Sequence, residues 1–100
     1  MDTPKSDKEL LAVAVELRPR LKMVLESGQY SSMAHYALVY LDLIVKVLRD
    51  GPSHPCYSQE ERGKIVRAIG KSVLDDHSFS ESPIGKELFD IGNAFYADKR

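Results

Sequence analysis

The most reactive side chains of the sequence gather in one short segment near its middle. Cys56, the only cysteine, follows His54, with Pro55 between them. A nucleophilic cysteine needs a base that forms the thiolate and a third group that orients the base. The segment supplies no oxyanion site, and Pro55 holds it extended, so we expect Cys56 to be a loop residue without a chemical role.

Metal binding is the second chemistry that these residue types suggest. His54 and Cys56, with either of the other two histidines, lack the ligand spacing of known metal sites. Asp75 and Asp76 precede His77 at a predicted helix end, where two carboxylates oppose the helix dipole and suit a cation or a basic partner. Such a run is more often a solvated helix end. We therefore predict no metal and no cofactor.

Basic residues form two groups at helical spacing: Lys64, Arg67 and Lys71 in the first, and Arg18, Arg20 and Lys22 in the second. Either group could meet an acidic protein or an anionic lipid surface, although a solvated face is the commoner explanation. The chain has 14 Lys and Arg against 15 Asp and Glu, a formal net charge of −1. Because nucleic-acid binding favours a basic excess, we predict a protein partner and no nucleic acid.

The last predicted helix carries residue types that are common in protein interfaces. Phe89 and Tyr96 form an aromatic line away from the apolar stripe of that helix, and Gly85 and Gly92 lie between the two lines. Glycines let another backbone approach closely, and exposed aromatic side chains anchor interfaces. The aromatic pair could instead pack beneath loops of the same domain. The residues that we predict to contact a partner are Gly85, Phe89, Gly92, Tyr96, Lys64, Arg67 and Lys71.

Four segments with helical periodicity would position these side chains, at about residues 7–26, 32–49, 59–76 and 83–97. Ser6 and Ser58 are each followed three residues later by glutamate, the pattern of a capping box, and Ser82 precedes a proline. No segment has the alternation of a strand. We predict an all-α fold, an antiparallel four-helix bundle in one domain spanning residues 1–100. Pro19 interrupts the first helix, either as a kink or as a break.

Each predicted helix has an apolar stripe that would form the core. The stripes comprise Leu10, Ala14, Leu17, Leu21 and Val24; Met33, Tyr36, Ala37, Tyr40, Leu41, Ile44, Val47 and Leu48; Ile65, Ile69 and Val73 with Val66; and Ile84, Leu88, Ile91 and Phe95. The second helix is apolar over most of its circumference and is expected to be central. On its narrow polar strip, Asp42 is expected to pair with Lys46.

The order of these elements and three short runs resemble a known family. The runs are EER at 60–62, LDDHSFSE at 74–81 and LFDIGNAFY at 88–96. They are similar to segments of the cytoplasmic immunity proteins that protect lactic-acid bacteria from their own pediocin-like (class IIa) bacteriocins. The resemblance implies a non-catalytic four-helix bundle that associates with the bacteriocin-occupied sugar-transporter receptor at the inner membrane face. It also implies that the fourth helix influences which bacteriocin is recognised.

Two alternatives remain open. The run GQY at 28–30, followed by Ala34, Ala37 and Leu41, resembles the helical hairpin of tetratricopeptide or microtubule-interacting-and-transport domains, which are adaptor modules. A small helical enzyme is the other alternative, but no convergent set of titratable residues supports it. The lone cysteine and the absence of a signal-peptide pattern favour a cytoplasmic location. We expect no membrane span, while peripheral contact with a membrane stays open.

Overall fold

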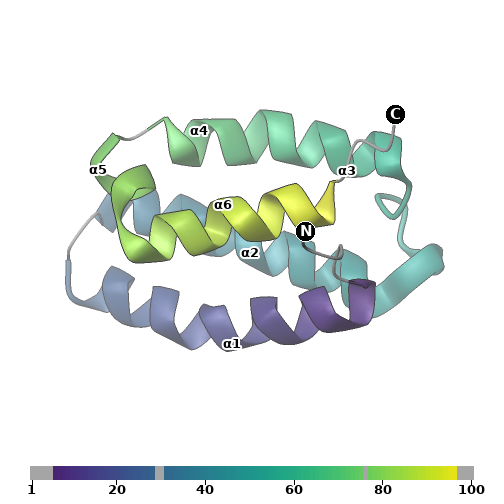
Figure 1. Ribbon diagram of the computed structural model, residues 1–100, viewed down its shortest axis with the longest axis horizontal. Helices are drawn as coiled ribbons and strands as arrows, with labels where there is room; N and C mark the ends of the chain where they lie inside the picture. Colours follow the sequence, from purple (N-terminus) through teal and green to yellow (C-terminus); the bar gives the residue numbers. More distant parts are fainter. Residues whose placement is uncertain (1–5, 29–30, 76, 97–100) are drawn as a thin grey trace, which may run out of the picture.

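The computed structural model describes residues 6–28, 31–75 and 77–96, and every regular element in these ranges is helical (Figure 1). The elements are α1 Asp7–Glu26, α2 Ser31–Asp50, the 3₁₀ turn η1 Gly51–Ser53, α3 Gln59–Ile65, the π-helical turn η2 Val66–Gly70, α4 Lys71–Leu74, α5 His77–Glu81 and α6 Pro83–Phe95. Along the chain, α1, α2, the segment from α3 to α4, and α6 run in alternating directions (Figure 1). The prediction of an all-α fold is confirmed for the described residues.

Three serines begin helices as the sequence predicts. The hydroxyls of Ser6, Ser58 and Ser82 accept hydrogen bonds from the backbone N–H three residues later, at 3.2, 3.3 and 3.1 Å. Each hydroxyl satisfies one of the backbone donors that a helix leaves free at its first turn. In a complete capping box the Glu9 carboxylate would accept a hydrogen bond from the Ser6 backbone N–H. Here it accepts one from the Ser6 hydroxyl instead.

Several expected boundaries differ from the structure. Helix α1 continues through Pro19, which excludes the break that the sequence left open beside a kink. The expected helix at 59–76 is divided by the wide turn η2, and the expected connector at 77–81 forms the short helix α5. The last helix ends at Phe95 rather than at residue 97, which lies outside the described ranges. Periodicity alone does not reveal a π turn, because it inserts one extra residue without ending the helix.

The core is formed largely by the predicted stripes. Leu10, Ala14, Leu17 and Leu21 of α1 and Ile84, Leu88, Ile91 and Phe95 of α6 are buried. Tyr40 of α2 is also buried, with 1% of its surface exposed. The expectation for Tyr36 is wrong, since 56% of its surface is exposed. Phe79 was not among the predicted core residues, yet α5 buries it completely.

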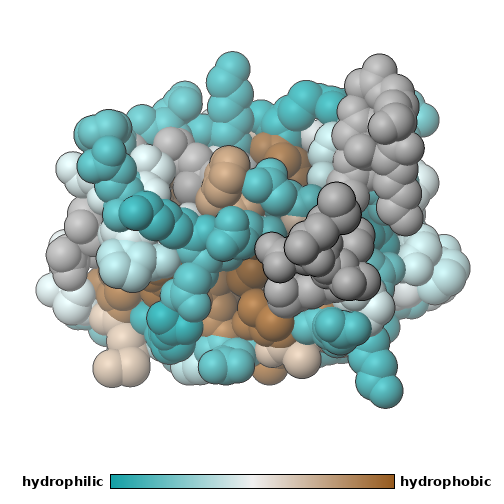
Figure 2. Space-filling model, viewed as in Figure 1, coloured by the Kyte–Doolittle hydropathy of each residue, from teal (hydrophilic) through white to brown (hydrophobic). Residues whose placement is uncertain are grey.

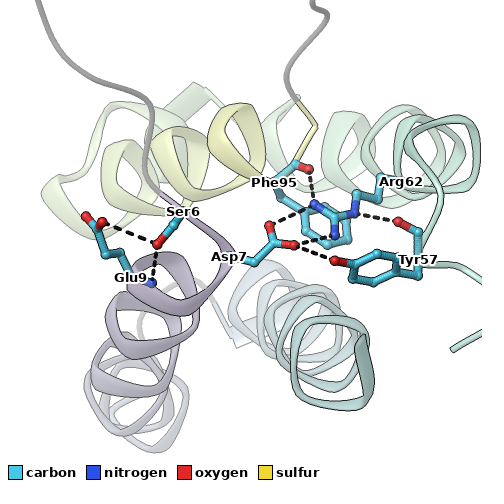
Figure 3. Close-up of polar contacts among 6 residues, drawn as sticks. All are labelled: Ser6, Asp7, Glu9, Tyr57, Arg62 and Phe95. Atoms are coloured by element: carbon cyan, nitrogen blue, oxygen red, sulfur yellow. Dashed lines mark hydrogen bonds and ion pairs between the residues drawn. The ribbon is translucent and has the colours of Figure 1, made fainter. Parts of the chain in front are cut away.

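A buried arginine ties three helix ends together (Figure 3). Arg62 of α3, only 3% exposed, donates to both carboxylate oxygens of Asp7 at 3.1 and 2.9 Å and to the backbone oxygens of Tyr57 and Phe95 at 2.9 and 3.1 Å. Its guanidinium also lies 4.7 Å from the centre of the Tyr57 ring and 4.9 Å from that of Phe95. Because a buried charge is tolerated only when it is paired and hydrogen-bonded, this network fixes the start of α1 against α3 and the end of α6.

Candidate functional site

A groove between η2–α4 and α6 brings together four of the seven residues predicted to contact a partner. Its volume is about 310 Å³. We call it the η2–α6 groove. It is lined by Tyr40, Val66, Arg67, Gly70, Lys71, Asp75, Phe89, Gly92 and Asn93. In Figure 2, apolar surface lies between α6 and the α3–α4 segment, flanked by hydrophilic side chains. Concave apolar surface with a few polar groups is the usual form of a binding site.

The Tyr40 side chain reaches the floor of this groove from α2. Methyl groups built at Gly70 and Gly92 would lie 2.7 and 2.5 Å from the Tyr40 hydroxyl oxygen, so this oxygen sits between the two glycines. Only glycine at these two positions leaves room for the hydroxyl. Burial raises the pKa of the Tyr40 phenol from its ordinary 10.0 to about 12. Like any tyrosine hydroxyl, it is protonated at neutral pH and able to donate a hydrogen bond.

The two walls of the groove differ, because only the η2–α4 wall carries charged groups. The α6 wall contributes the ring of Phe89, which is 51% exposed. The η2–α4 wall combines the half-buried Val66 with Arg67 and Lys71, which lie one helical turn apart and are exposed, as is Asp75. The groove lining thus carries two positive charges against one negative charge. The π turn η2 forms part of this wall, and such turns are frequent at functional sites.

Tyr96 lies next to the groove and contacts Arg67, one of its lining residues. The Arg67 guanidinium lies 5.8 Å from the centre of the Tyr96 ring, a cation–π contact. A methyl group at Gly63 would lie 3.0 Å from the same ring, so Tyr96 packs closely on α3. The aromatic line of α6 and the basic group of α3–α4, assigned to separate helices in the sequence, are neighbours on one face.

Of the seven residues predicted to contact a partner, five lie in or beside the groove, Lys64 lies outside it, and Gly85 is buried against Phe79. Arg67, Lys71, Phe89 and Gly92 line the groove, and Tyr96 adjoins it. Lys64 is exposed and pairs with Glu61 at 2.9 Å, and the hydrogen bond to Glu61, with its charge, raises the pKa of Lys64. Their contact with a partner stays a prediction.

The two predicted interface glycines of α6 approach this chain rather than open surface. Both are buried. A methyl group at Gly85 would lie 1.9 Å from the backbone oxygen of Phe79, so α5 already occupies the space that was expected to admit another backbone. Gly92 accommodates the Tyr40 hydroxyl in the same way. The reason for glycine at these positions is therefore internal packing, and the accessible groups of this face are the side chains around them.

The two arginines of the second basic group are engaged in ion pairs within the chain. Arg18 donates to Asp42 at 2.6 Å, and Arg20 donates to Glu87 at 2.9 and 2.6 Å. These hydrogen bonds, with the charges of the carboxylates, raise the pKa of both arginines. The structure thus joins Asp42 to α1 rather than to Lys46, contrary to the expectation. Long-range pairs of this kind cannot be read from spacing along one helix.

The candidate catalytic and metal-binding residues lie apart. His54 Nδ1 accepts a hydrogen bond from the Cys56 backbone N–H at 2.9 Å, which turns the imidazole toward the backbone. His77 Nε2 lies 3.2 Å from a carboxylate oxygen of Glu81, and His35 packs against Tyr36 on α2. Asp76 lies outside the described ranges. Within those ranges no three His, Cys, Asp or Glu side chains gather as metal ligands would.

A second groove, of about 430 Å³, lies between α2 and the η2–α4 segment. It is lined by Met33, Tyr36, Ala68, Ile69, Ser72 and Val73. None of these side chains is charged at neutral pH, so this groove offers no electrostatic selection between ligands. The η2–α6 groove is the better candidate, although it is the smaller of the two.

No helix in the described part of the chain has the length and apolar character needed to cross a lipid bilayer. Comparison with models of known protein families, with curated proteins and with solved structures found no match to this chain.

Proposed function

We propose that the chain is a non-catalytic, cytoplasmic protein-binding module, and that its specific role is immunity to a pediocin-like bacteriocin. In this proposal the helices form an antiparallel four-helix bundle in which α3, η2 and α4 act as one helix. The bundle associates with the bacteriocin-occupied sugar-transporter receptor at the inner face of the membrane.

One observation carries the binding part of the proposal. The aromatic Phe89 and the basic Arg67 and Lys71, distant in sequence, flank a single groove next to Tyr96. A half-exposed aromatic side chain beside arginine is the composition of an interface anchor. The immunity part rests on the resemblance of the runs at 60–62, 74–81 and 88–96 to that family.

Expression in a bacteriocin-sensitive strain tests the immunity role. Cells that carry the chain should survive at least one member of a panel of pediocin-like peptides at concentrations that kill cells carrying the empty vector. Unchanged killing by every peptide, with the protein present at a normal level, would refute the immunity role.

Two matched variants test whether the groove is the contact surface. Phe89→Ser removes a side chain that is 51% exposed, while Val39→Ser removes one that is 48% exposed on α2, outside the groove. Because the two side chains are similarly exposed, neither substitution should unfold the chain. We expect protection to fall with Phe89→Ser and to persist with Val39→Ser. Equal protection by both variants would place the contact elsewhere.

The adaptor alternative makes a different prediction. A tetratricopeptide-like or microtubule-interacting-and-transport-like module would give no protection against bacteriocins, but would capture a defined peptide in a manner sensitive to Phe89→Ser. Gln29 and Tyr30, on which that resemblance partly depends, lie outside the described ranges, and no specific observation favours the adaptor over the immunity protein.

A further inference from the structure

The hydroxyl of Tyr40 at the floor of the η2–α6 groove has no hydrogen-bond partner among the described residues. The Tyr40 residue as a whole is buried, with only 1% of its surface exposed. Among the described residues, every side-chain oxygen or nitrogen that is fully enclosed has a hydrogen-bond partner. Because the Tyr40 oxygen has none, it is not fully enclosed and must be in contact with open space. That space is the groove, which the two flanking glycines also line.

A hydroxyl in this position prefers a ligand that accepts a hydrogen bond. The phenol is protonated at neutral pH, as its ordinary pKa of 10.0 already ensures, so it can donate a hydrogen bond. Because the hydroxyl faces the groove and has no acceptor among the described residues, a ligand oxygen that accepts from it gains the bond without displacing an internal one. The ligand must therefore place an acceptor at the groove floor.

Charge and apolar surface narrow the class of ligand further. Arg67 and Lys71 in one wall outweigh Asp75, which favours an anion. Phe89 in the opposite wall and the Tyr40 ring below favour an aromatic ring, since such rings pack edge-to-face or offset. A carboxylate can be attracted by the two basic groups and accept from the hydroxyl.

The size of the groove sets the scale of the ligand. Its volume of about 310 Å³ is roughly twice the ~150 Å³ of an apolar cavity that holds benzene. There is room for one ring and a short arm that carries a charged group. We propose that the η2–α6 groove binds a small aromatic carboxylate, with its ring against Phe89 and a carboxylate oxygen accepting from Tyr40. This inference is independent of the immunity role and of any protein partner.

The full ¹⁵N-labelled chain is titrated with 3-phenylpropionate, and amide shifts are followed by NMR. The neutral 3-phenylpropanamide tests the need for charge, and propionate tests the need for the ring. We expect saturable shifts at millimolar concentration, concentrated in residues 66–71 and 89–93, with binding of each control weaker by about ten-fold or more. Equal binding of the amide, or shifts spread over the whole chain, would overturn the proposal.

Three variants assign the contacts. Tyr40→Phe keeps the ring and removes only the hydroxyl, which makes no internal hydrogen bond, so the fold should be retained while binding weakens about ten-fold. Lys71→Gln should weaken binding about three-fold at low salt, and the difference should vanish at high salt. Asp75→Asn should tighten binding about three-fold, because it removes the opposing charge. Unchanged affinity of Tyr40→Phe, with its fold verified by the amide spectrum, refutes the assignment of the floor.

Discussion

The contact between Tyr40 and two helical glycines can be tested by replacing each partner separately and together. A methyl group at Gly92 would lie 2.5 Å from the Tyr40 hydroxyl oxygen but 3.6 Å from the ring carbon that bears it. The first distance requires atoms to shift, whereas the second is an ordinary contact. Because the Tyr40 ring is buried, it cannot swing aside. The hydroxyl alone therefore excludes alanine at position 92.

The magnitude follows from two opposing terms. Overpacking of a buried site costs about 1–3 kcal/mol, and Gly→Ala in a helix interior gains up to about 1 kcal/mol. Gly92→Ala should destabilise the wild-type chain by about 1–2 kcal/mol. In the Tyr40→Phe background only the gain remains, so the same change should stabilise by about 0.5–1 kcal/mol. The expected coupling free energy is about 2 kcal/mol, and the sign of the effect reverses.

Gly70 offers an internal contrast. A methyl group there would lie 2.7 Å from the Tyr40 oxygen and still only 2.9 Å from the ring carbon that bears it. Removing the hydroxyl relieves one contact and leaves the other, so Gly70→Ala should destabilise the chain in both backgrounds. Gly63→Ala, which meets the Tyr96 ring instead, should have the same effect with or without the Tyr40 hydroxyl.

Urea unfolding followed by far-ultraviolet circular dichroism measures these differences as shifts of the midpoint at constant slope. If Gly92→Ala changes the free energy of unfolding equally in both Tyr40 backgrounds, the hydroxyl does not lie between the glycines. The description of the groove floor would then be wrong.

Three further predictions concern stability. Asp7→Asn should destabilise the chain by about 2–3 kcal/mol, because it leaves the Arg62 guanidinium buried without its counter-charge. Arg62→Met removes the buried charge itself and should destabilise the chain less, an order that the urea midpoints of the two variants check. Gly85→Ala should cost about 3 kcal/mol, because its methyl group meets the rigid backbone oxygen of Phe79; a melting temperature within 3 °C of wild type would contradict this. The raised pKa of Tyr40 means that the unfolded chain loses the phenolic proton near pH 10 and the folded chain near pH 12. Stability from this group is complete below pH 10 and falls by at most about 3 kcal/mol between pH 10 and 12, a loss that Tyr40→Phe should not show when the midpoints of the two proteins are compared.

Features encoded by neighbouring residues could be predicted from the sequence. The hydroxyls of Ser6, Ser58 and Ser82 act on backbone groups three residues away, so a short pattern contains the whole interaction. The buried stripe of α6 follows from helical spacing in the same way. Tyr36 was misplaced because periodicity gives the face of a helix but not how far the neighbouring helix covers that face.

The features that were missed depend on residues far apart in the chain. Arg62 has the polarity of a surface residue, and only the approach of Asp7 and of the end of α6 makes its burial tolerable. The glycines at positions 63, 70 and 92 are packed against Tyr40 and Tyr96, and spacing along one helix could not identify these side chains. The sequence therefore predicted only part of the groove. It indicated Arg67, Lys71 and Phe89 of the walls as contact residues, but it did not indicate that Tyr40 forms the floor.

The groove floor links stability and binding through one atom. Phenylalanine at position 40 keeps the tyrosine ring and removes only the hydroxyl, which packs between Gly70 and Gly92 but makes no hydrogen bond to a described residue. An incompletely solvated donor is unfavourable, and its removal should leave the free energy of unfolding unchanged or raise it. If the hydroxyl serves a ligand, Tyr40→Phe must weaken binding without reducing stability. A variant that loses both would show that the hydroxyl supports the fold, and a variant that loses neither would show that the groove does not use it.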